Sequence, residues 1–114
     1  MSKYFSIDEM KCKHCGEIAM DEDFMKKLDE ARDLAGIVFV ITSGYRCKEY
    51  DDRIHADGNH PQGKAADIEA PNSVSRFKII SALIKVGFKR IGTDQQFIHA
   101  DTCTDRPQDV MWLY

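Results

Sequence analysis

The chain has 114 residues, 43% of them hydrophobic and 31% charged, which is ordinary for one soluble globular domain. The formal net charge is -3 and the basic residues are scattered, so the composition predicts no nucleic-acid partner. No apolar stretch approaches transmembrane length and the N-terminus lacks the apolar core of a signal peptide. We therefore expect no membrane insertion and a protein that is cytoplasmic on synthesis.

The first third of the chain predicts two helices. Ser6 and Glu9 have the spacing of a capping box, which indicates a short helical turn. Residues 10–20 are expected to form a loop. From Asp21 to Ala35 the apolar residues follow helical spacing, acidic residues fill the first turn, and Gly36 stands where a C-terminal cap belongs.

The next segments predict strands. The continuous apolar run 37–42 indicates a buried central strand, and a helical turn is expected near residues 49–54. Residues 64–70 alternate in polarity, so Ala65, Asp67 and Glu69 should face one way and Ala66, Ile68 and Ala70 the other.

The last third predicts a helix and short strands. Ser73 is expected to cap the helix and Gly87 to close it, with an apolar stripe of Phe77, Ile80, Leu83 and Ile84. Strands are expected at about 88–91, 97–102 and 110–113. The order of elements predicts a single small α+β domain over residues 1–114, with a mostly antiparallel sheet flanked by two main helices.

Two histidines and one aspartate have the residue types of a hydrolytic metal site. His60 and Asp67 are seven positions apart across a turn, and His99 lies near the end of the chain. These side chains can hold a zinc ion and leave its fourth position to water. Asp67 has small apolar neighbours and needs a partner, because burying an unpaired charge is costly. The alternative is an ordinary loop histidine and an ordinary acid at a strand edge.

Asp101 should share a strand face with His99, since residues two apart lie on the same side of a strand. One interpretation is a structural contact between the two side chains on an exposed sheet. Another is that Asp101 accepts a hydrogen bond from a metal-binding imidazole.

Arg46 follows the predicted buried strand and the Ser43-Gly44 turn, so its position should be rigid. A fixed guanidinium can bind a substrate carboxylate or stabilise an oxyanion. The alternative is a surface arginine that pairs with Glu49 or Asp52.

Four cysteines in a chain without an export signal argue against a disulfide framework. Cys12 and Cys15, followed by Gly16, look like half of a zinc knuckle. Cys47 and Cys103 could complete a structural four-thiolate site if the fold brings them there. The alternative is four reduced thiols, two of them at a turn.

Three motifs together resemble the peptidase M15 family, in particular its small D-Ala-D-Ala carboxypeptidase-like domains. They are Ser43-Gly44-Tyr45-Arg46, then His60-x-x-Gly63-x-Ala65-x-Asp67, then Phe97-Ile98-His99-x-Asp101. The resemblance spans about residues 4–106. Many such domains occur in bacteriophage lysis proteins (endolysins) and in bacterial peptidoglycan hydrolases.

The resemblance implies a role for each matching residue. Zinc would be bound by His60, Asp67 and His99, and Arg46 would stabilise charge near the substrate. Family members cleave bonds that involve D-amino acids in peptidoglycan stem peptides. In such sites zinc activates a bound water and a carboxylate takes its proton.

The chain departs from the family pattern at two positions. Many members have Ser where this chain has Gly58, and several have the catalytic acid where it has Gln96. Gln cannot act as a general base. We expect Asp101 to replace the missing acid, with Asp94 as the other candidate.

The sequence therefore predicts a monomeric zinc metallopeptidase that hydrolyses peptidoglycan stem peptides, as a D,D-carboxypeptidase or a related endopeptidase. It would reach the cell wall after release through a membrane lesion, as a phage lysis enzyme does. One alternative is a non-catalytic zinc-binding or cell-wall-binding module of the same fold. Another is a virion structural module.

Overall fold

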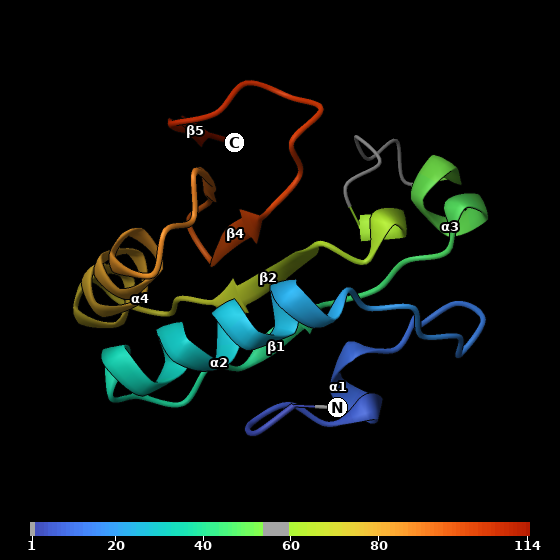
Figure 1. The fold of residues 1–114 in the computed structure, drawn as a ribbon, viewed down its shortest axis with the longest axis horizontal. Helices are drawn as coiled ribbons and strands as arrows, with labels where there is room; N and C mark the ends of the chain where they lie inside the picture. The colour runs from blue at the N-terminus through green and yellow to red at the C-terminus, as the bar shows by residue number, and fades with distance from the viewer. Residues whose placement is uncertain (1, 54–59) are drawn as a thin grey trace.

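Five short strands form one sheet, and the two longest helices pack on one of its faces (Figure 1). The computed structural model describes residues 2–53 and 60–114, and the expected helical end at residue 54 and the Gly58 position lie outside them. The predicted α+β class with a mostly antiparallel sheet is confirmed. The elements are α1 Ile7–Met10, α2 Glu22–Ala35, β1 Ile41–Ser43, α3 Lys48–Arg53, η1 His60–Gln62, β2 Ala65–Glu69, α4 Ser73–Lys85, β3 Arg90–Thr93, β4 Phe97–Asp101 and β5 Val110–Leu113.

The strand order across the sheet is β1-β2-β4-β3-β5, and every neighbouring pair is antiparallel except β3 with β5. At the centre, β2 pairs with β4 so that Asp67 lies opposite His99 and Ile68 opposite Ile98. Because side chains alternate along a strand, this register puts the apolar residues on one face and the polar pair on the other.

Helix α2 forms as the sequence predicts. Asp21 caps it by accepting a hydrogen bond from the Phe24 amide at 2.9 Å, and Gly36 ends it in the left-handed conformation with φ 69°. The buried side of α2 consists of Phe24, Met25, Leu28 and Ala31. The capping box at Ser6 and Glu9 is also present and begins α1.

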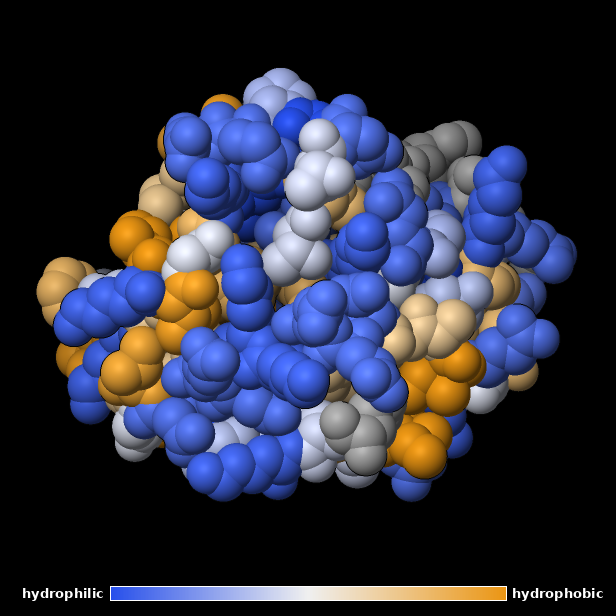
Figure 2. All heavy atoms as spheres, viewed as in Figure 1, coloured by the Kyte–Doolittle hydropathy of each residue, from blue (hydrophilic) through white to orange (hydrophobic). Residues whose placement is uncertain are grey.

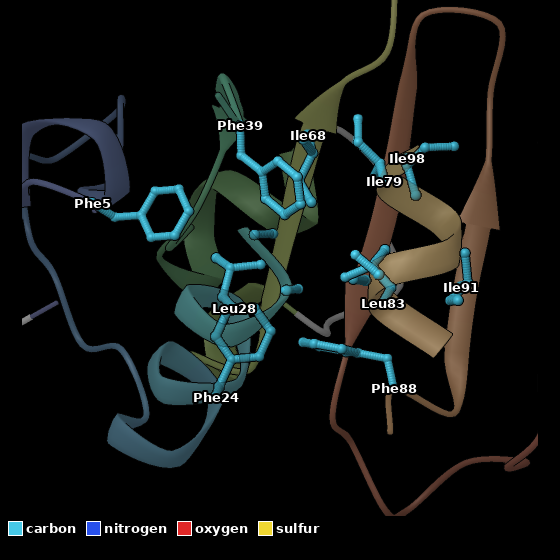
Figure 3. Packing of buried hydrophobic residues seen from close by; sticks show 14 of the residues in the cluster. Phe5, Phe24, Leu28, Phe39, Ile68, Ile79, Leu83, Phe88, Ile91 and Ile98 are labelled. Atoms are coloured by element: carbon cyan, nitrogen blue, oxygen red, sulfur yellow. The ribbon is translucent and has the colours of Figure 1, made fainter. Parts of the chain in front are cut away.

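The hydrophobic core lies between the two helices and the apolar face of the sheet. Figure 3 shows Phe24 and Leu28 of α2 directed toward Phe39 and Ile68, with Phe88 beside Leu83 of α4. Ala66, Ile68 and Ala70 are fully buried, as the alternation over residues 64–70 predicts. Small alanines on β2 and β4 let the helices approach the sheet closely.

The predicted central strand over residues 37–42 is wrong. The strand there, β1, has three residues and stands at the edge of the sheet. Val38 is 70% exposed and Val40 48%, whereas Phe39 between them is 2% exposed. The run is continuous in hydrophobicity, but only one of its two faces contacts the core.

The predicted buried face of the second long helix is also partly wrong. Phe77 of α4 is 74% exposed and Ile84 is 54% exposed, while Ile79, Ala82 and Leu83 are buried. Asn72 caps the helix in place of Ser73. Apolar residues occur around most of α4, so the sequence does not single out the buried side. Figure 2 shows hydrophobic residues at the α4 side of this face and a second group at the lower right, with mostly hydrophilic residues between them.

The remaining expectations hold within two residues. The helical turn expected near residues 49–54 is α3, and the three C-terminal strands are β3, β4 and β5. Among the described residues, no helix combines the length and the apolar character that crossing a membrane requires.

A pair of substitutions tests the orientation of α4. Leu83→Ala should lower the free energy of unfolding by about 2–5 kcal/mol, because it leaves a cavity in the core. Phe77→Ala should change it by less than about 0.5 kcal/mol, because the ring is exposed. Urea denaturation followed by circular dichroism measures both. A larger loss for Phe77→Ala than for Leu83→Ala would contradict this orientation.

Candidate metal centre

The polar face of the sheet carries one row of side chains that crosses all five strands. The register aligns Ser43 of β1 with Asp67, Asp67 with His99, His99 with Gly92, and Gly92 with Trp112 of β5. Gly92 leaves room for the aromatic ring, since a Cβ there would lie 2.7 Å from Trp112 atoms. The Trp112 ring therefore reaches across β3, and its centroid lies 5.6 Å from that of His99.

Three side chains converge at the β2 end of this row. The candidate ligand atoms of His60, Asp67 and His99 all lie within 4.8 Å of one another, and all three residues are buried. Asp67 Oδ1 is 2.9 Å from His99 Nδ1 and 3.5 Å from His60 Nε2. Helix η1, which begins at His60, brings the first imidazole back to the strand that carries Asp67. The fold thus brings together the three residues predicted to bind metal.

Each of the three side chains directs one polar atom toward the space between them. The other polar atom of each side chain is hydrogen-bonded to a residue outside the cluster. His60 Nδ1 donates to the Gly44 carbonyl at 2.7 Å. Asp67 Oδ2 accepts from Arg46 Nη2 at 3.4 Å, and His99 Nε2 is bound to Asp101 Oδ2 at 2.8 Å. Imidazoles that bind metal ions usually donate their second N–H to a carbonyl or carboxylate in this way. The residues present therefore fit a metal ion.

The electrostatics of the cluster fit the same interpretation. Burial opposes the charged form of Asp67, but hydrogen bonds with His60 and His99 outweigh it and hold the pKa of this carboxyl well below its usual range. Burial also disfavours a charged His99, but Asp101 and Asp67 raise its pKa to about 9. A protonated His99 would offset part of the negative charge of Asp67 and Asp101. A bound cation would take over that role.

The Ser43–Arg46 segment positions two of the three side chains. The Tyr45 amide donates to the Met10 carbonyl at 2.8 Å, which ties the segment to the end of α1. Arg46 is 9% exposed, and its guanidinium contacts Ser43, Asp51 and Asp67. Arg46 is therefore not the surface arginine of the alternative interpretation. Its described carboxylate partners are Asp51 and Asp67, and the Asp52 side chain lies outside the described part of the chain. Arg46 therefore offsets the charge of a candidate metal ligand.

Asp101 is fully buried behind His99. Its Oδ1 accepts from Arg90 Nε at 2.8 Å and from the Cys103 amide at 3.2 Å, while Oδ2 binds His99. Arg90 in turn lies over the Trp112 ring, with its Cζ 4.9 Å from the centroid. Both carboxylate oxygens are thus engaged away from the space between the three candidate ligands. The geometry favours the interpretation in which Asp101 orients a metal-binding imidazole, and a role in proton transfer stays a prediction.

Comparison with known proteins agrees with this geometry. A family model described as peptidase M15 matches residues 3–101. The chain belongs to the peptidase M15 family. No curated protein matches it. M15 peptidases are generally metal-dependent, so family membership supports a metallopeptidase, and the cluster of His60, Asp67 and His99 is one candidate metal-binding group in the described part of the chain.

The other acid proposed for this M15 domain lies apart from the cluster. Asp94 follows β3 and accepts a hydrogen bond from the Gln96 amide at 3.0 Å in an exposed turn. It lines a cleft with Arg76 and Tyr114 that contains none of the three candidate ligands.

The four cysteines do not form one group. Cys12, Cys15 and Cys47 come together, but Cys103 is not among them. The Cys103 thiol donates to Gln62 Oε1 at 3.4 Å, and burial raises its pKa to about 11. The possible four-thiolate site is therefore reduced to three thiols, because Cys103 follows β4 and its thiol contacts Gln62 instead of the other cysteines.

Sequence reasoning missed several supporting residues of the centre. Asp51 is 1% exposed and binds Arg46, and Arg90 is 6% exposed and binds Asp101. Arg90 and Gly92 share a strand face with period two, which is the one signal that could have placed them beside His99. The chain's one tryptophan, Trp112, lies in the last strand and gives no local sign of its contact with His99.

Asp101→Asn tests the orienting role. The amide oxygen still accepts from His99, but the negative charge is lost, so affinity for zinc or cobalt should fall by about 10–100-fold. Competition with a chromophoric chelator measures the affinity. Asp105→Asn, an exposed change four residues on, should leave it unaltered. Unchanged metal affinity together with a large fall in kcat would contradict the orienting role and support proton transfer.

Proposed function

We propose that this protein is a zinc metallopeptidase that hydrolyses peptidoglycan stem peptides, as a D,D-carboxypeptidase or a related endopeptidase. The observation that carries the proposal is the convergence of His60, Asp67 and His99, each with its outer atom held by a fixed partner. Membership of the peptidase M15 family supports the same chemistry.

Zinc suits this set of donors. Two imidazoles and one carboxylate are typical of catalytic zinc sites, which keep a further position open. When bound, a zinc ion supplies a Lewis acid for the scissile carbonyl and lowers the pKa of its water. The residues around it keep the two rings and the carboxylate in place before any metal arrives, which reduces the ordering that binding requires.

The proposed substrate site is the cleft that borders Asp67. Its volume is about 240 Å³, and its lining includes Arg46, Tyr50, Phe97, Lys11 and Lys13. Three basic side chains at one cleft favour an anionic ligand, such as the terminal carboxylate of a stem peptide. The flanking rings of Tyr50 and Phe97 would contact the apolar parts of such a peptide. In this proposal Arg46 stabilises charge on the substrate as well as on Asp67.

A non-catalytic zinc-binding or cell-wall-binding module is the second candidate. Two observations favour it: Gln96 stands where several family members have their acid, and both oxygens of Asp101 are already bound. The two proposals agree on metal binding and differ in turnover. In either case we propose that the protein acts at the cell wall, after it leaves the cell through a membrane lesion, as a phage lysis enzyme does.

Two alanine substitutions and a matched control test the proposal. His60→Ala and Asp67→Ala should each lower the zinc-dependent hydrolysis of a D-Ala-D-Ala peptide or purified peptidoglycan by more than about 100-fold. Loss of a metal ligand should cost more than the roughly 10–100-fold caused by loss of a residue that only hydrogen-bonds to a ligand. Glu69→Ala, on the same strand but exposed, should keep full activity. Product release followed by mass spectrometry measures the rates.

Two outcomes would decide against the catalytic proposal. Full activity in the His60 and Asp67 variants would show that these residues do not hold a catalytic metal. Wild-type protein that binds zinc and sediments with peptidoglycan, but releases no product, would favour the non-catalytic module.

A further inference from the structure

Three thiols gather in a second cluster, separate from the candidate zinc ligands. The Sγ atoms of Cys12, Cys15 and Cys47 all lie within 4.8 Å of one another, and none is in a disulfide. Cys12 is buried, Cys47 is partly exposed and Cys15 is exposed. The cluster therefore has a closed inner side and an outer side that an ion can reach.

A tight turn brings Cys15 back to Cys12. The Gly16 amide donates to the Cys12 carbonyl at 2.8 Å, and the Cys12 amide donates to the Glu17 carbonyl at 2.7 Å. Gly16 has φ 77°, a left-handed conformation that residues with a side chain rarely adopt. The Cys-x-x-Cys-Gly spacing is thus used to place two sulfurs side by side, as in a metal-binding knuckle.

The backbone around Cys12 is arranged to support a thiolate. The Cys47 amide donates to Cys12 Sγ at 3.3 Å, and the amides of His14 and Cys15 also interact with this sulfur. Backbone amides directed at one sulfur stabilise its negative form. They also fix the positions of the two segments that supply the thiols.

We propose that Cys12, Cys15 and Cys47 bind a second metal ion, a thiophilic divalent cation such as zinc. Sulfur ligands at about 2.3 Å from a tetrahedral ion lie about 3.8 Å apart, so a small contraction of the cluster suffices. The fourth position takes one nitrogen or oxygen donor. His14 is the nearest in sequence, and its ring is stacked on Tyr50 with centroids 5.5 Å apart.

This ion would be structural and would support the first centre. It would join the turn at residues 12–16 to Cys47, which directly follows Arg46. The same segment contains the Gly44 carbonyl that holds His60. A metal bound by the three cysteines would therefore keep in place the groups that position both His60 and Asp67.

Metal content of single variants tests the proposal, independently of peptidase activity. Protein purified under reducing conditions and loaded with zinc should hold two ions per chain, measured by plasma mass spectrometry. Cys15→Ser and Cys47→Ser should hold one, and His60→Ala should also hold one. Cys103→Ser is the matched control and should keep two, because its thiol lies outside the cluster.

X-ray absorption at the zinc edge supplies a second readout, measured on His60→Ala, which keeps all of its cysteines. The ion left in His60→Ala should have about three sulfur neighbours at about 2.3 Å and one lighter neighbour. Unchanged metal content in both cysteine variants, or a zinc edge without sulfur neighbours, would each overturn the proposal. So would a disulfide within the cluster that persists in the reducing buffer. A single ion in the wild type that has sulfur neighbours and is lost in Cys15→Ser would instead support this site and count against the first centre.

Discussion

The buried carboxylate of Asp67 is the constraint on which the rest of the structure depends. An ionised carboxylate that leaves water without partners is strongly unfavourable, so a fold that buries one must surround it with positive or donor groups. Here those groups come from three different parts of the chain: His60 in η1, His99 across the sheet on β4, and Arg46 after β1. Their convergence on one oxygen pair is what makes the cluster a candidate metal centre.

The sheet meets this demand with one register. The pairing of β2 with β4 that puts Asp67 opposite His99 also puts Ile68 opposite Ile98 in the core. A slip of one residue would place the carboxylate among the helices and the isoleucine at the metal site. The core and the centre are therefore stabilised by the same set of backbone hydrogen bonds. This explains how a short sheet can hold a charged cluster rigidly.

The features that could be predicted from the sequence are those that depend on residues close together in the chain. The alternation of polar and apolar residues around Asp67 and the capping residues of α2 are visible in short stretches of sequence. The strand, the helix and the three candidate ligands could therefore be predicted. The edge position of β1 could not, because the apolar run at residues 37–42 looks the same whether one face or both are covered. The exposure of Phe77 has the same cause, since α4 has apolar residues around most of its surface.

The supporting groups were harder to predict, since their partners are distant in sequence. Asp101 could be placed on the face of His99, but its engagement by Arg90 depends on the β3–β4 register. Likewise Cys47 joins the Cys12 turn while Cys103 does not, a distinction that spacing alone cannot make. Long-range pairing thus decides which polar residues bind the ligands and which would act on a substrate.

The central claim is that His60, Asp67 and His99 hold one metal ion through their inward atoms. An anomalous difference map from crystals of the zinc-loaded protein, measured at the zinc edge, tests it most directly. We expect a peak about 2.0–2.2 Å from His60 Nε2, Asp67 Oδ1 and His99 Nδ1, with Asp101 still bound to His99 Nε2. A map with no peak between these three atoms, or with the ion bound through His99 Nε2, would contradict it.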